Sequence, residues 1–72
     1  MLITEKNTPA TEKLVRSAAA QRFGRGKGKP WFEHGQWWLI IDDYYEEGRE
    51  TIFSVVDAEP GIGTTGLDFE EV

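Results

Sequence analysis

The residues with the clearest chemical potential are carboxylates clustered within segment 42–50. They are Asp42, Asp43, Glu46, Glu47 and Glu50. Paired carboxylates can hold magnesium for phosphoryl transfer or share a proton in acid–base catalysis. Nuclease-type sites also need a lysine or a comparable base beside the acids, and only Arg49 is near. The alternating acids and central glycine of a calcium loop are absent as well. We therefore expect a solvated acidic hairpin with no metal and no catalytic residue.

Imidazole and thiol chemistry is almost excluded by composition. The sequence contains one histidine, His34, and no cysteine, so the usual zinc ligand sets cannot form. Ser17 and Ser54 would need a neighbouring base to act as nucleophiles, and His34 is the sole histidine candidate. Because Gly35 follows it, His34 is better explained as a turn residue. We expect no nucleophilic site and no cofactor, and we predict that the protein is not an enzyme.

Segment 24–30 is rich in glycine and basic residues, which invites comparison with a phosphate-binding loop. The spacing of that motif would place its first glycine at Phe23 and its hydroxyl residue at Pro30, so the motif is absent. A basic loop with accessible amides can still contact phosphates through counterion release. In this alternative Trp31 stacks on a base of a single strand. The phosphate-binding residues would be Arg16, Arg22, Arg25, Lys27 and Lys29.

One predicted helix, residues 9–23, precedes the candidate sites. Thr8 can cap its first turn, and Pro9 suits the first helical position. Gly24 can end the helix because glycine accepts the left-handed conformation found at many helix ends. An apolar stripe recurs at helical spacing and comprises Leu14, Val15, Ala18, Ala19 and Phe23.

The rest of the chain predicts strands. Segment 31–38 indicates a hairpin with His34 and Gly35 at its tip, the second strand continues towards Tyr45, and segment 51–56 is rich in β-formers. The predicted fold is α+β, with one N-terminal helix packed on a three- to four-stranded antiparallel meander sheet. The chain divides as one small domain with arm 1–8, helix 9–23, basic loop 24–30, β-hairpins 31–57, flexible loop 58–66 and edge strand 67–72.

The period of two in a strand separates the aromatic residues into two groups. One face should hold Phe32, Trp37, Leu39 and Ile41, and the other Trp31, Trp38, Ile40, Asp42 and Tyr44. A single helix covers only one face of a sheet, so Trp31, Trp38 and Tyr44 are predicted to form a partner-binding aromatic surface. Alternatively, another segment or a second copy of the chain covers them.

Charge is strongly segregated along the 72 residues, although the net charge is only −5. Residues 1–30 carry seven basic groups and two acids, whereas residues 31–72 carry eleven acids and Arg49. Asymmetry of this kind suggests a charged partner, unless the two halves neutralise each other.

We expect the acidic hairpin and the aromatic surface to bind a basic protein. The carboxylates can imitate the phosphates of nucleic acid, as in small acidic inhibitors of nucleic-acid-binding proteins made by phages and mobile elements. The alternatives are a nucleic-acid binder that uses the basic helix and loop, and a small structural or homodimerising domain. The longest apolar run, Trp37 to Ile41, is far too short to span a membrane, so we expect a cytoplasmic protein without membrane contact.

Overall fold

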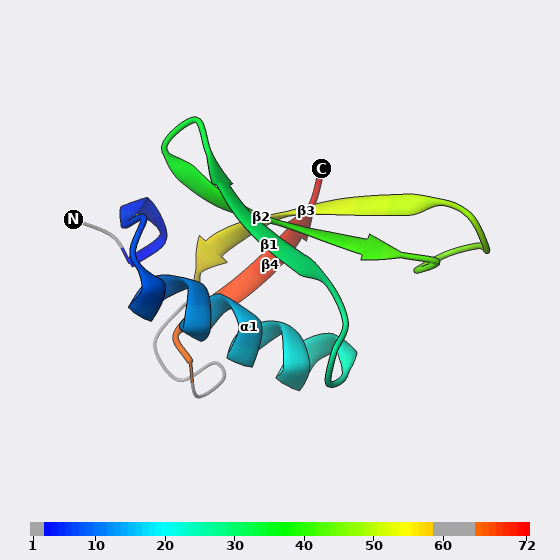
Figure 1. Cartoon of the computed structure of the whole chain (residues 1–72), viewed down its shortest axis with the longest axis horizontal. Coiled ribbons are helices and arrows are strands. Elements are labelled where there is room, and N and C mark those ends of the chain that lie inside the picture. Colours follow the sequence, from blue (N-terminus) through cyan, green and yellow to red (C-terminus); the bar gives the residue numbers. More distant parts are fainter. Residues whose placement is uncertain (1–2, 59–64) are drawn as a thin grey trace.

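A computed structural model describes residues 3–58 and 65–72 and gives one helix packed on one sheet. In chain order the elements are a 3₁₀ turn η1 (Ile3–Glu5), helix α1 (Pro9–Phe23) and strands β1 (Lys29–Glu33), β2 (Gln36–Asp42), β3 (Glu50–Asp57) and β4 (Leu67–Glu71). The strands form an antiparallel meander in the order β1-β2-β3-β4, and α1 lies against one side of it (Figure 1). The predicted α+β class and its architecture are confirmed.

Helix α1 begins and ends at the predicted residues because its capping signals are local. Thr8 has extended backbone angles, and its Oγ1 accepts a hydrogen bond from the Thr11 N–H at 3.1 Å. Pro9 occupies the first turn, where its missing N–H leaves no bond unmade. The Gly24 N–H donates to the Ala20 carbonyl at 3.0 Å, and Gly24 has φ +109° and ψ 155°. Its φ is positive as expected, although its ψ lies outside the left-handed helical region.

The first hairpin has the predicted tip. His34 and Gly35 both have positive φ, 54° and 77°, as a two-residue type I′ turn requires. Two other predicted boundaries are wrong. The predicted loop 24–30 ends earlier, since Lys29 and Pro30 already belong to β1. The second strand ends at Asp42 rather than continuing towards Tyr45, because Asp43 takes φ +60° and turns the chain.

The sheet ends in an edge strand, as predicted for segment 67–72. The predicted flexible loop 58–66 lies mostly outside the described residues. Within the predicted arm 1–8, residues 3–5 form the unpredicted 3₁₀ turn η1.

The hydrophobic core lies between α1 and one face of the sheet. Val15, Ala18 and Ala19 present the helix stripe, and the small alanines let the helix approach the strands closely. The sheet contributes Trp37, Leu39, Ile41, Phe53, Val55, Leu67 and Phe69, all buried. Leu14, Phe23, Phe32 and Ile3 pack around this core and are partly buried.

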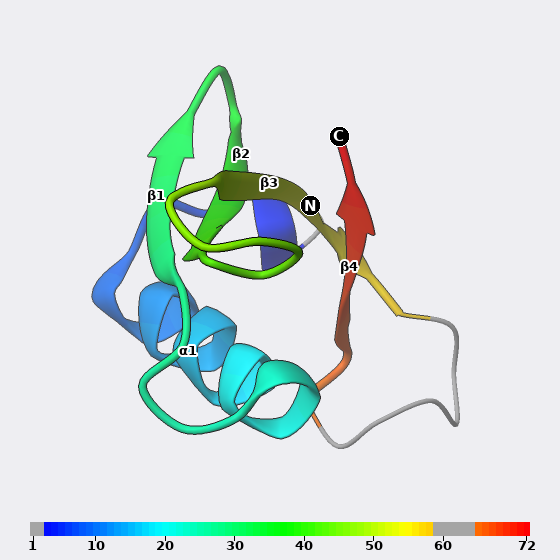
Figure 2. The same cartoon turned by 90° about the vertical axis from the view of Figure 1, so that its right-hand side faces the viewer.

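Both helical elements occupy the same side of the sheet. Helix α1 contacts the two edge strands, β1 and β4, which stand at its flanks in Figure 2. Turn η1 reaches the same side, because Trp37 Nε1 donates to the Lys6 carbonyl at 2.7 Å and Thr4 Oγ1 donates to Asp57 at 3.0 Å. None of the described helices is long and apolar enough to cross a membrane.

Candidate interaction surface

The side of the sheet that faces away from α1, here called the open face, has an apolar centre. Because side chains alternate along a strand, the residues next to each core residue in β1 to β4 point to the open face. No described helix packs over these residues. Ile52 is 40% exposed, and the other members are partly buried against one another. The apolar residues of the open face are Trp31, Trp38, Ile40, Ile52 and Val56.

Trp31 and Trp38 form the rigid part of this surface. They are directly opposed on β1 and β2, and their rings stack with centroids 6.1 Å apart and planes 21° apart. Trp38 Nε1 donates to the Glu33 carbonyl at 3.0 Å, which fixes the orientation of its ring. The two predicted aromatic residues therefore lie together on the uncovered side, as the assumed register requires.

Carboxylates border the apolar centre. Asp42 and Glu50 are register partners at one end of the β2–β3 ladder. Among the described residues, neither of these side chains has an ion-pair or hydrogen-bond partner. Asp68 pairs with Arg22 at 3.1 Å. The charged residues whose register places them on the open face are Glu33, Asp42, Glu50, Asp68 and Glu70, with Lys29 as the basic exception.

The predicted acidic cluster is exposed, but its members have different roles. Asp43 Oδ1 accepts the Gly48 N–H at 2.6 Å, so this carboxylate organises the turn between β2 and β3. Glu46 pairs with Arg49 at 3.8 Å. Asp42, Glu47 and Glu50 are left with no such contact within residues 3–58 and 65–72. Over the same residues, no three acidic or imidazole side chains form a group able to hold a metal ion.

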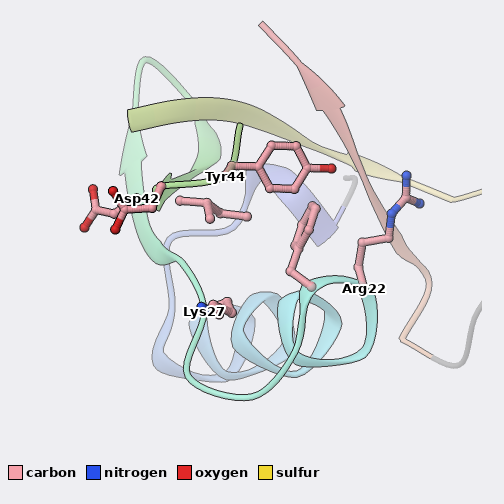
Figure 3. A pocket seen from close by; sticks show the side chains of 7 residues that line it. Arg22, Lys27, Asp42 and Tyr44 are labelled. Atoms are coloured by element: carbon pink, nitrogen blue, oxygen red, sulfur yellow. The ribbon is translucent and has the colours of Figure 1, made fainter. Parts of the chain in front are cut away.

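The prediction that Tyr44 shares the face of Trp31 and Trp38 is wrong. Its ring packs edge-on against Phe23 and Phe53, at centroid distances of 5.7 and 5.3 Å, on the helix side of the sheet. Tyr44 lines a hollow of about 320 Å³ together with Lys27 and Asp42. In Figure 3 the Tyr44 ring lies at this hollow, and Arg22 is directed away towards β4. The alternation that predicted its position ends at Asp43, where the positive φ reverses the direction of the chain.

Tyr45 adds a link between the β2–β3 turn and the last strand. Its phenol donates a hydrogen bond to the Glu71 carboxylate, and its ring packs edge-on against Tyr44 at 4.7 Å. The bond to Glu71 raises the pKa of Tyr45 above its ordinary value of 10.0, with smaller contributions from desolvation and from the Glu71 charge. The turn is therefore attached to the C-terminal strand by a protonated phenol.

The predicted phosphate-binding residues separate into three places. Arg22 is paired with Asp68, and Lys29 lies on the open face. Arg25 and Lys27 line a groove together with Arg16, although Arg16 lies about nine residues earlier in the sequence. The groove also includes Lys13, which the sequence reasoning missed. Trp31 is on the other side of β1 from Pro30, which lines the groove, so Trp31 cannot stack on a base held there.

Sequence reasoning also missed Ile52 and Val56 as members of the open face. Strand β3 carries apolar residues on both faces, so its period gives no sign of which set is buried. Only the pairing of Ile40 with Ile52 identifies the exposed set.

The two charged halves are hardly neutralised by one another. Among the described residues, the only ion pair within 4.0 Å that joins a basic group of residues 1–30 to an acid of residues 31–72 is Arg22–Asp68. Within residues 3–58 and 65–72, the other basic groups of the first half form no ion pair, apart from Arg16, which lies 3.9 Å from Glu12.

Comparison of the chain with known protein families, curated proteins and solved structures gives no match.

Proposed function

We propose that this chain is a small non-catalytic interaction module whose open face docks on a basic protein. The observation that carries the proposal is the stacked and half-buried Trp31–Trp38 pair on a sheet face bordered by carboxylates. Uncovered apolar surface surrounded by polar residues is typical of protein-binding sites, and tryptophan is among the residues that contribute most to binding.

The geometry of the tryptophan pair favours tight docking. Stacking at 6.1 Å and the bond from Trp38 Nε1 to the Glu33 carbonyl hold both rings in place before a partner arrives. Side chains that are already ordered lose less conformational entropy on binding. The partner therefore gains apolar contact without the usual cost of fixing two large side chains.

The charges argue for a basic partner rather than a second copy. Carboxylates on an exposed sheet raise the rate at which a positively charged surface arrives, and this effect weakens as salt is added. In a symmetric dimer through the same face, the acidic border of one copy would meet that of the other. Asp42 and Glu50, which have no described partner, would then lie near like charges.

The edges of the sheet argue for docking on the face rather than by strand addition. Pro30 has no N–H to offer at the outer edge of β1. On β4, the bond from the Val72 N–H to the Ile52 carbonyl places the Phe69 N–H on the outer side, where it donates to Asp68 Oδ1 at 2.8 Å. Each edge thus lacks one of the donors that an added strand would use.

A nucleic-acid-binding protein is the kind of basic partner that fits best. Its binding groove is positively charged, and the exposed carboxylates of Asp42, Glu47 and Glu50 can take the place of phosphates there. Occupation of the groove would inhibit that protein. This part of the proposal rests on charge and size alone.

Affinity capture from a lysate of the producing organism, at low and at high salt, tests the proposal. We expect the wild-type chain to retain a basic protein at low salt. Trp31→Ser with Trp38→Ser should abolish retention, and Asp42→Asn with Glu50→Gln should weaken it.

The matched control is Glu12→Gln, which removes one carboxylate on the helix side of the sheet and is compared with Asp42→Asn alone. Equal loss in the control would show that overall charge, rather than the open face, governs capture. Retention that survives both open-face variants would overturn the proposal.

A further inference from the structure

A second surface of opposite charge lies on the other side of the sheet. It is a groove of about 320 Å³ between α1 and the loop that leads into β1. Lys13, Arg16 and Ser17 line it from the helix, and Arg25 and Lys27 line it from the loop. We call these five residues and the space between them the basic groove.

The helix residues of the basic groove share one face of α1. Lys13 and Arg16 are three residues apart, and Lys13 and Ser17 are four apart, so their side chains project as neighbours. They can supply two positive charges and a hydroxyl donor to one ligand. The floor between them and the loop is formed by small or apolar residues, among them Ala20 and Pro30.

The loop residues are held against this helix face by a close backbone contact. Gly28 has φ +85°, and a Cβ at this position would lie 2.7 Å from Leu39 Cδ1. Because Leu39 is fully buried, the loop is fixed to the core at Gly28. The Lys27 N–H also donates to the Gly24 carbonyl at 3.3 Å. Arg25 and Lys27 are therefore presented by a shaped turn.

The charges of the basic groove are available to a ligand. Lys13, Arg25 and Lys27 have no ion-pair partner within the described part of the chain. The contact of Arg16 with Glu12 is long, at 3.9 Å, and both side chains are exposed. Of the open-face acids, Asp42 comes nearest to the groove, because it lines a neighbouring hollow together with Lys27. Lys13, Arg16 and Arg25 do not line that hollow.

We propose that the basic groove binds the phosphate backbone of a nucleic-acid strand. Four cations along an open groove match several consecutive phosphates better than a single one, and guanidinium groups bind phosphate through two parallel hydrogen bonds. The proposal is independent of the partner of the open face. The cations of the basic groove differ from the phosphate-binding residues expected from the sequence. They include Lys13 and do not include Arg22 or Lys29.

Fluorescence anisotropy of a labelled oligothymidylate of about twelve nucleotides provides the test. Neutralisation of four phosphates predicts a slope near −3 in the logarithmic dependence of affinity on salt. The affinity should therefore fall by about 50-fold between about 50 and about 200 mM salt. Absence of binding at about 50 mM salt would overturn the proposal.

Two triple variants separate the groove from general charge. Lys13→Gln, Arg25→Gln and Lys27→Gln together should weaken binding by about tenfold or more and make the salt slope shallower by about 2. The control combines Lys6→Gln, Lys29→Gln and Arg49→Gln, which removes the same charge outside the groove and should change the affinity far less. Circular dichroism verifies that both variants remain folded. If both triple variants lost the same affinity for the oligonucleotide, the basic groove would not be the binding site.

A competition arm distinguishes a strand from a small phosphate. Unlabelled oligothymidylate should displace the probe at a concentration far below that of inorganic phosphate or a mononucleotide. If these small phosphates compete as well as the strand does, the assignment to nucleic acid is wrong.

Discussion

Gly28 approaches Leu39 so closely that a Cβ on the glycine would lie 2.7 Å from Leu39 Cδ1. The φ of Gly28, +85°, is also unfavourable for any other residue. This contact joins the basic loop to the centre of the core, because Leu39 is fully buried. The Gly28–Leu39 contact therefore belongs both to the fold and to the shape of the basic groove.

Replacement of Gly28 by alanine should lower the free energy of unfolding by about 2–4 kcal/mol, from backbone strain and overpacking together. Gly26→Ala is the control, since Gly26 has φ +78° but nothing within 4 Å of an added Cβ. Strain alone predicts a loss of about 1–2 kcal/mol there. Urea denaturation measures both, and equal losses would show that Leu39 simply moves aside.

Trp37 and Trp38 are adjacent in the chain but should differ strongly in their contribution to stability. Trp37 is 3% exposed and donates to the Lys6 carbonyl at 2.7 Å, whereas Trp38 lies on the open face. Trp37→Ala should lower the free energy of unfolding by about 3–5 kcal/mol, as truncation of a buried aromatic residue does. Trp38→Ala should cost less than about 2 kcal/mol because less apolar area is lost. Chemical denaturation of both variants checks this, and similar losses would contradict the assignment of faces.

Much of this fold is encoded in signals that act over a few residues. Thr8 and Pro9 begin the helix, Gly24 ends it, and His34 with Gly35 closes the hairpin. Each signal depends on the backbone preference of the residue itself, so the sequence alone predicts the element and its position. The pairing of Trp31 with Trp38 follows directly from the hairpin tip.

The parts that could not be predicted depend on where the chain goes between elements. Aspartate tolerates positive φ only moderately well, so nothing in the sequence marks Asp43 as the residue that ends β2 and redirects Tyr44. The meeting of Lys13 with Arg25 and Lys27 likewise depends on the path of the loop over the helix. Local preferences carry no information about such long-range proximity.

The turn after β2 should depend on the carboxylate of Asp43. Asp43 combines φ +60° with a bond from the Gly48 N–H at 2.6 Å. Asp43→Ala should lower the free energy of unfolding by about 1–2 kcal/mol, whereas Asp43→Asn should lose much less because asparagine tolerates this φ and can accept the same bond. Glu47→Ala, in the same turn, is the neutral control. Thermal and urea unfolding would contradict this role if alanine and asparagine behaved alike.

Tyr45 should ionise at a higher pH than an ordinary tyrosine. Its bond to Glu71 favours the protonated phenol and raises the pKa of Tyr45 above 10.0. A raised pKa in the folded state means that the stabilisation is fully present below the pKa of the unfolded chain. It is lost as the pH rises through the pKa of the folded state. NMR titration of the ring carbons should show this shift, and Glu71→Ala, which removes the acceptor, should lower the pKa of Tyr45. A Tyr45 pKa that is unchanged by this substitution would exclude the hydrogen bond as its cause.

Asp42 and Glu50 are directly opposed on β2 and β3, so two like charges face each other at the end of the ladder. Opposed like charges destabilise a sheet, and Asp42→Asn should therefore raise the free energy of unfolding by about 0.2–1 kcal/mol at low salt. The gain should shrink at high salt, where the repulsion is screened.

The same substitution removes a carboxylate from the open face and should weaken capture of the basic partner. If Asp42→Asn stabilises the fold and weakens capture, the opposed carboxylates of Asp42 and Glu50 serve recognition rather than stability. Glu12→Gln is the control, because its carboxylate lies on the helix side. If Asp42→Asn left both stability and capture unchanged, neither the repulsion nor the recognition role would hold.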